Sequence, residues 1–270
     1  MKNNYYCLVS GLQDITLDTQ KLLFNQKSLK QELREMLSAD DFKLVEKLYL
    51  PFDNENLINI ILKTDKPFNV QGDFSKEHIE ANLKEPVELS AYMQRFINAH
   101  NSGESVYPNL IAENELTTLF YDAMLAEENE FIRNWYEFNL NIKNILTGIS
   151  CRKHKMNLEN QIIGNTEVSD NIKKSHAGDF GLANILHYIE DIVNIARTED
   201  IIEREKAIDK FKWEYLSEVT FFEYFTIDKI LAFTLKTSMV ERWLTIDAEY
   251  GKEMFDKLLK ELKSGYEYKR

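Results

Sequence analysis

The chain has 270 residues, with 33 basic and 45 acidic side chains, and its formal net charge of -12 at pH 7 disfavours nucleic acid or anionic lipid as the main partner. Only two cysteines occur, at distant positions, which is typical of a reduced cytoplasmic protein and not of a disulfide framework. Nine glycines and four prolines are few for this length, so the composition favours long helices with few tight turns.

No signal peptide or membrane span is expected from the sequence. The first residues lack the charged and apolar blocks of a secretion signal. The most apolar region, residues 219–235, is interrupted by Glu223, Asp228 and Lys229, so we expect no direct insertion into a bilayer.

The first fifty residues predict short helices after an ambiguous start. Residues 5–12 form an apolar run that is too short for its period to separate a buried strand from the first turns of a helix. Ser28, followed by Gln31, predicts a capping box that starts a helix ending near Leu37. Ser38 predicts the N-cap of the next helix.

Between Pro51 and Pro108, the helix-breaking and capping residues predict three further short helices. Pro51 is expected to end the preceding helix, and Asp53 is expected to cap a new one. Ser75 is predicted to cap a short helix, and residues 89–97 form one more amphipathic helix. A loop ending at Pro108 then separates this part from the rest of the chain.

Residues 111–152 predict one continuous helix, because apolar side chains recur in steps of three and four along the whole stretch. Such a helix is about 60 Å long and needs neighbours along its flank. Residues 157–179 are polar and weakly helical. The later predicted helices cover residues 182–196, 198–216, 227–244 (capped by Thr226) and 248–264 (capped by Asp247, ended by Gly265).

These patterns predict a mainly α fold, an elongated multi-helix bundle built on one long central helix. The loop before Pro108 suggests an N-terminal part of short helices, residues 1–108, and a second part, residues 109–270, that contains the central helix and a C-terminal bundle. One continuous structural unit is the alternative.

The sequence predicts no catalytic, cofactor-binding or metal-binding residue. Helical bundles can hold di-iron centres through paired Glu-x-x-His motifs, but no histidine here has a glutamate three residues before it. Cys151 and His154 are a lone pair with zinc-ligand spacing and no second pair. Glycine-rich phosphate loops and hydrolase or metalloprotease motifs are absent from the sequence.

Three other features have both a structural and a functional interpretation. Arg152, Lys153 and Lys155 form the densest basic cluster, which either complements a helix C-terminus or contacts an acidic partner; we take them as candidate protein-interaction residues. Three asparagines in residues 138–144 favour structural hydrogen bonds over partner recognition. The aromatic run at residues 221–225 is predicted to lie in the core, with an exposed protein interface as the alternative.

Several segments resemble an uncharacterised bacterial family whose genes accompany those of V-type ATPase subunits. The segments are Tyr5-Tyr-Cys-Leu-Val-Ser-Gly-Leu12, Phe52-Asp-Asn-Glu-Asn-Leu57, Phe221-Phe-x-Tyr-Phe-Thr226, Glu241-Arg-Trp243 and Gly251-Lys-Glu-Met-Phe255. The stretch Asn141-Ile-Lys-Asn-Ile-Leu146, followed by Arg152 and Lys153, is similar to the C subunits of V/A-type ATPases, which are called d in eukaryotes. The Ala-Arg-Val-Arg element common near the start of archaeal C subunits is replaced here by Leu8-Val-Ser-Gly11.

This resemblance implies a non-catalytic adaptor that links the central-stalk subunits D and F to the membrane rotor ring. It implies a cytoplasmic protein that is peripheral on the inner membrane through the ATPase complex, without cofactor or nucleic acid. Two alternatives remain open: a helical scaffold unrelated to the ATPase, and a metal-dependent enzyme in a helical bundle.

Overall fold

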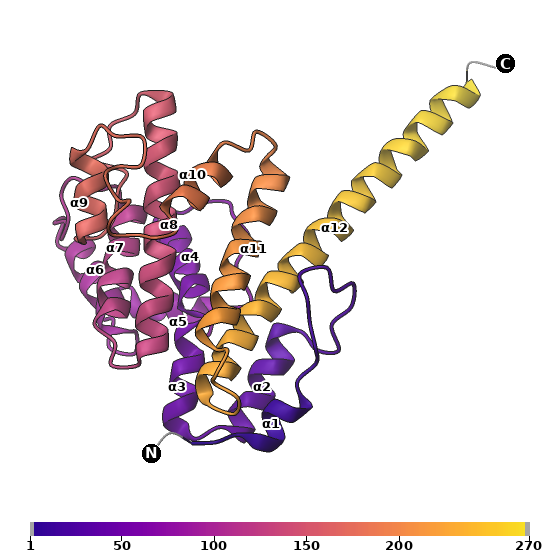
Figure 1. Cartoon of the computed structure of the whole chain (residues 1–270), viewed down its shortest axis with the longest axis horizontal. Helices are drawn as coiled ribbons and strands as arrows, with labels where there is room; N and C mark the ends of the chain where they lie inside the picture. The colour runs from indigo at the N-terminus through magenta and orange to yellow at the C-terminus, as the bar shows by residue number, and fades with distance from the viewer. Residues whose placement is uncertain (1–2, 268–270) are drawn as a thin grey trace. The chain divides into compact units, whose positions relative to one another are not determined.

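The computed structural model describes the backbone of residues 3–267 and the side chains of residues 3–247. The described backbone forms twelve α-helices and no β-strand (Figure 1). The predicted mainly α fold is therefore confirmed for this part of the chain. Within the described residues, no helix combines the length and apolarity needed to cross a membrane.

The helices belong to two compact units. Unit 1 consists of residues 1–45 and 209–270, and unit 2 of residues 46–208. These limits differ from the parts 1–108 and 109–270, whose independence as domains stays a prediction. The boundaries fall within two helices, α3 (Ala39–Lys47) and α11 (Ile201–Val219). The other helices of unit 1 are α1 (Tyr6–Gly11), α2 (Gln26–Met36) and α12 (Ile227–Glu267); those of unit 2 are α4 (Leu50–Ile61), α5 (Lys76–Asn82), α6 (Ala91–Asn101), α7 (Ala112–Leu125), α8 (Glu130–His154), α9 (Glu167–Lys174) and α10 (Ile189–Ala196).

The packing of unit 1 is organised around α12. Helix α2 packs on it, and the buried Gln26 donates from Nε2 to the carbonyl of Thr234 at 3.2 Å. The Asp209 carboxylate accepts from the Trp243 indole at 2.8 Å and also from Arg242. A buried carboxylate needs such donors, because removing its charge from water is costly.

The segment 5–12 forms a helix over Tyr6–Gly11, which decides between the two structures that the sequence left open. Helix α1 is short and buries only Leu8 among its own residues. Its start is fixed by the amide of Tyr5, which donates to the carbonyl of Phe225 at 2.7 Å, and by Tyr6, whose ring lies 4.6 Å from that of Phe225. Tertiary contacts within unit 1 therefore hold a segment too short to form a stable helix alone.

Of the four N-caps predicted before Pro108, those at Ser38 and Ser75 are confirmed and those at Ser28 and Asp53 are wrong. The hydroxyls of Ser38 and Ser75 accept from the amides three residues later, as predicted. Helix α2 is capped by Asn25, and Ser28 is the N3 residue that completes the box. The prediction placed the cap at Ser28 because both residue types are good caps. Asp53 is buried inside the first turn of α4, which already contains Pro51 near its start.

The predicted continuous central helix over residues 111–152 is wrong, because the segment forms two helices, α7 and α8. Asn129 begins α8 by accepting from the amide of Ile132 at 2.9 Å. The guanidinium of Arg133 donates back to the carbonyl of Glu127 at 3.0 Å, which stabilises the break. Apolar periodicity continues through this break because both helices bury their faces in the same unit.

The longest described helix is instead α12, with 41 residues. It continues past Asp247 and Gly265, so the predicted cap and stop at these positions are wrong. The predicted helix over residues 182–196 is also shorter than expected, since only α10 is helical. Phe180 and Gly181 both have positive φ, and residues 182–188 form turns in which the Leu186 amide bonds to the Leu182 carbonyl.

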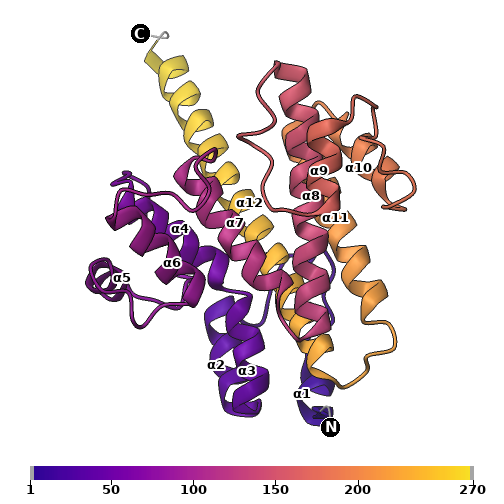
Figure 2. The ribbon, with the colours of Figure 1, turned by 90° about the vertical axis from the view of Figure 1, so that its left-hand side faces the viewer.

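Helix α8 is the centre of unit 2 and packs against α7, α9 and α10 (Figure 2). Its fully buried residues include Ile132, Leu140 and Ile145. Aromatic rings fix its sides: Tyr136 meets Phe120 edge to face at 5.1 Å between centroids, as expected for the quadrupoles of two rings.

Candidate protein-interaction site

Three aromatic side chains are exposed together in the turn between α11 and α12 of unit 1. The exposed fractions are 64% for Phe221, 79% for Phe222 and 62% for Tyr224. The rings of Phe221 and Phe222 contact each other edge to face, with centroids 4.9 Å apart. We call these three residues the aromatic tip. Rings of this size normally lie in the core or in an interface, since their burial contributes much to stability.

The turn that carries the aromatic tip is well anchored within unit 1. On one side the buried Thr220 hydroxyl donates to the carbonyl of Leu216 at 2.7 Å. On the other side the Thr226 hydroxyl donates to the Glu223 carboxylate at 2.7 Å, and Phe225 packs on Tyr6. The tip therefore presents its rings from a fixed turn, which lowers the entropy cost of binding a partner.

The prediction that residues 221–225 lie in the core is wrong for three of the four aromatic residues. Phe225 is the only one of the four that is not exposed. Sequence alone could not separate the interpretations, because a dense aromatic run has the same composition in a core and in an interface. The exposed arrangement is the alternative that the sequence had left open.

The basic cluster at the end of α8 in unit 2 is only partly available for a partner. Arg152 donates to the carbonyl of Ser175 at 2.5 Å and also to that of Ala177. Its guanidinium carbon lies 3.8 Å from the centroid of the buried Phe180 ring, a cation–π contact. Lys153 and Lys155 are exposed. All three residues lie at the C-terminal end of α8, and their role in a partner contact stays a prediction.

The three asparagines of α8 make structural hydrogen bonds, as the sequence favoured. Asn139 donates to the carbonyl of Trp135 at 2.7 Å, and Asn141 donates to the Tyr188 hydroxyl at 3.3 Å. Asn144 bonds both backbone groups of Ile163. The bonds of Asn141 and Asn144 tie α8 to the segments around it, whereas the bond of Asn139 lies within its own helix.

The side chains that could take part in catalysis or metal binding are dispersed in the described part of the chain. Among its His, Cys, Asp and Glu residues, no group of three is placed to hold a metal ion. Cys151 is buried, and this burial raises the pKa of its thiol, whereas His154 is exposed. A buried thiol with a raised pKa is a packing group more than a nucleophile or a zinc ligand.

Comparison with known proteins relates nearly the whole chain to one family. Residues 1–266 match the model of a family described as a protein of unknown function, DUF2764. An uncharacterized protein of Chlamydia muridarum (strain MoPn / Nigg) is 21% identical over 275 residues, covering 97% of this chain and 99% of that protein. No solved structure matches the chain.

Proposed function

The chain belongs to the DUF2764 family, and from this premise we propose that it is a non-catalytic adaptor in the central stalk of a V/A-type rotary ATPase. In this role it links the stalk subunits D and F to the membrane rotor ring. It works in the cytoplasm, peripheral on the inner membrane through the complex, and it needs no cofactor. The likeness of residues 141–146 to the C subunits of these ATPases belongs to the same proposal.

The observation that carries the proposal is the aromatic tip. Phe221, Phe222 and Tyr224 lie in the segment Phe221-Phe-x-Tyr-Phe-Thr226, one of those that carry the resemblance to the ATPase-associated family. Their rings are exposed, so their contribution to the stability of unit 1 is small. Aromatic residues are enriched among the few residues that dominate binding energy in protein interfaces. A partner surface that buries the tip accounts for these exposed rings.

The direct test is calorimetric titration of the full chain with the purified D and F subunits from its own source. The adaptor proposal expects saturable one-to-one binding. A parallel sedimentation experiment with purified rotor rings tests the other end of the link. Absence of binding to both partners would overturn the proposal and favour a helical scaffold unrelated to the ATPase.

Three variants locate the interface. Phe221→Ser/Phe222→Ser/Tyr224→Ser removes the tip, and we expect it to weaken stalk or ring binding at least thirtyfold, the equivalent of about 2 kcal/mol. Val70→Ser/Val87→Ser is the matched control, because these valines of unit 2 are 85% and 76% exposed. Lys153→Glu/Lys155→Glu tests the basic cluster without disturbing Arg152. If the tip variant binds as tightly as wild type, the aromatic tip is not part of the interface.

A further inference from the structure

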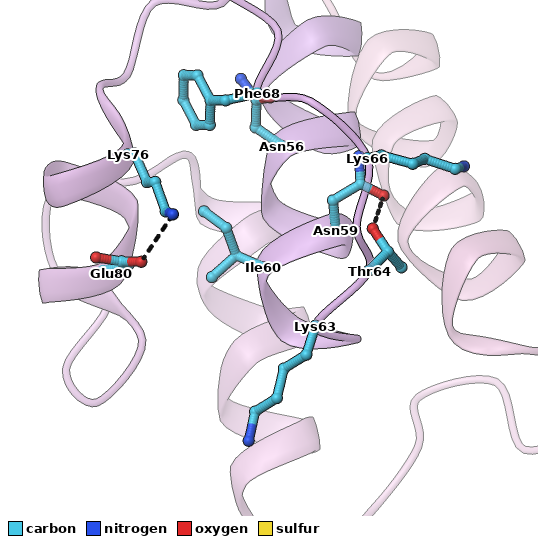
Figure 3. Close-up of a pocket in the computed structure, with 9 residues that line it drawn as sticks. All are labelled: Asn56, Asn59, Ile60, Lys63, Thr64, Lys66, Phe68, Lys76 and Glu80. Atoms are coloured by element: carbon cyan, nitrogen blue, oxygen red, sulfur yellow. Dashed lines mark hydrogen bonds and ion pairs between the residues drawn. The ribbon is translucent and has the colours of Figure 1, made fainter.

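A pocket in unit 2 collects positive charge in a strongly acidic chain. It has a volume of about 260 Å³ and lies beside the end of α4, the following loop and α5 (Figure 3). Its ionisable lining is three lysines, Lys63, Lys66 and Lys76, against one glutamate, Glu80. The whole chain has a net charge of -12, so this local excess of cations is unusual.

Asn59, which lines the pocket, carries a buried hydrogen-bond donor without a partner. Asn59 is only 9% exposed, and its Nδ2 has no acceptor. The other end of the same amide is used, since Oδ1 accepts from the Thr64 hydroxyl at 2.9 Å. Leaving a buried donor without an acceptor costs about 1–3 kcal/mol, so an acceptor that reached Asn59 Nδ2 would stabilise the protein.

The neighbouring amide shows how the pocket is held in shape. Asn56 donates to the carbonyl of Asn69 at 2.8 Å and accepts from the Asn69 amide at 2.7 Å. This pair of bonds fixes the loop after α4 against the helix. The pocket is thus bounded by a loop that is fixed against α4.

The three lysines come from different segments around the pocket. Figure 3 shows Lys76 extending from α5 toward α4, while Lys63 and Lys66 extend outward from the rim. Lys76 is held only by Glu80, at 3.9 Å, which is a long exposed ion pair of little energy. Lys63 and Lys66 are exposed, and their four-carbon stems allow both to turn inward, at a cost of up to about 2 kcal/mol each in side-chain entropy.

Lys63 is also unusual in its backbone. It ends α4 with φ of 52°, and the Thr64 amide bonds to the Asn59 carbonyl at 3.0 Å, which is a Schellman motif. Glycine is the common residue at this left-handed position, because other residues have a steric cost there. The dipole of α4 favours a lysine near this end, but it does not account for the donor left open on Asn59.

We propose that this pocket binds a small phosphate-type oxyanion through the Asn59 side-chain amide and the ammonium groups of Lys63, Lys66 and Lys76. Charge-assisted hydrogen bonds to oxygen are what ammonium groups and amide donors offer together. The volume is below the range of roughly 300–1,000 Å³ that suits drug-sized ligands, so a phosphate group or a small phosphorylated compound fits better than a nucleotide. The inference is independent of the adaptor proposal.

The test is a titration of the ¹⁵N-labelled full chain with inorganic phosphate at low ionic strength, observing the Asn59 side-chain amide and the Thr64 backbone amide. We expect saturable shifts at both groups with phosphate, and none with chloride at equal ionic strength. Linear or absent shifts would overturn the proposal.

Two glycine variants separate binding from folding. Lys63→Gly removes one cation while relieving the left-handed backbone, so we expect a protein no less stable than wild type whose phosphate affinity falls about tenfold. Lys155→Gly is the matched control, because Lys155 ends α8 with φ of 55° and the Met156 amide bonds to the Cys151 carbonyl in the same way. Unchanged phosphate affinity in Lys63→Gly would contradict the proposed site.

The phosphate group could belong to a soluble compound or to a lipid. Vesicles of phosphatidylcholine with and without phosphatidic acid distinguish these sources in a sedimentation experiment. Phosphate shifts without sedimentation assign the site to a soluble ligand. Sedimentation that requires phosphatidic acid and is lost in Lys63→Gly assigns the site to a lipid headgroup. If neither the phosphate shifts nor the sedimentation is observed, both sources are excluded and the proposal is overturned.

Discussion

The side-chain amide of Asn144 forms two hydrogen bonds with the backbone of Ile163, donating to its carbonyl at 2.8 Å and accepting from its amide at 3.1 Å. Both residues are completely buried. The pair substitutes for the bonds that a strand or helix would give this backbone, and it fixes the segment after α8 against the helix.

Asn144→Ala is therefore expected to be strongly destabilising. It leaves a buried N–H and a buried C=O without partners, and we expect the free energy of unfolding to fall by about 2–4 kcal/mol. Urea titration followed by tryptophan fluorescence and circular dichroism measures the change. Asn139→Ala is the control, since Asn139 bonds only within its own helix, and its effect should stay below about 1 kcal/mol. Equal effects of the two substitutions would contradict this account.

The contact of Arg152 with Phe180 predicts a structural role for one residue of the basic cluster. Arg152→Ala removes the cation from the ring and leaves the carbonyls of Ser175 and Ala177 without their donor, so we expect a loss of about 1–3 kcal/mol. Thermal unfolding checks this. The exposed neighbour, Lys153→Ala, should change stability by less than about 0.5 kcal/mol. Equal stability of wild type and Arg152→Ala would mean that these contacts contribute nothing in solution.

A close approach at Gly148 gives another prediction for the same region. An added Cβ would lie 2.8 Å from Cγ2 of Ile172 and 2.9 Å from Cζ of Phe180. Overpacking costs about 1–3 kcal/mol, which exceeds the gain of about 1 kcal/mol from replacing glycine in a helix. We therefore expect Gly148→Ala to lower the melting temperature.

The control for Gly148 is Gly178→Ala, where an added Cβ meets nothing within 4 Å. This substitution should be neutral or slightly stabilising, because it restricts only the unfolded chain. A melting temperature of Gly148→Ala at or above that of Gly178→Ala would show that the neighbours give way without cost.

The features that could be predicted from the sequence are those that local chemistry decides. The caps at Ser38 and Ser75 depend on residues within one turn, and the asparagines of α8 were recognised because poor helix formers in an apolar helix need a reason. The break at Asn129 carried a cap signal, but the apolar period ran through it and favoured one helix.

The sites themselves depend on tertiary structure. The exposure of Phe221, Phe222 and Tyr224 follows from where the turn between α11 and α12 lies, and composition has no information about that. The pocket beside α4 exists because a loop returns to bond Asn56, so lysines from a helix end, a loop and a second helix line one cavity. The left-handed backbone conformation of Lys63 could likewise not be predicted from the periodicity of apolar residues.

Lys236 in unit 1 predicts how stability depends on pH. Burial, with a smaller contribution from Lys229, lowers the pKa of Lys236 from its ordinary value of 10.5 to about 8. Between these values the folded protein binds fewer protons at this site than the unfolded chain, so the contribution of Lys236 to stability rises with pH. It is fully present above pH 10.5 and is lost as the pH falls through about 8.

The variant Lys236→Met isolates this contribution, because it keeps the unbranched apolar stem and cannot titrate. We expect the free energy of unfolding of wild type, minus that of the variant, to increase between pH 8 and 10.5 in urea titrations. Lys153→Met, at an exposed lysine, controls for the loss of one positive charge. A difference between wild type and Lys236→Met that stays constant over this range would show that the ammonium group is as well solvated in the folded protein as in the unfolded chain, even though it donates to Ser217 at 2.7 Å and lies 4.8 Å from the Trp213 ring.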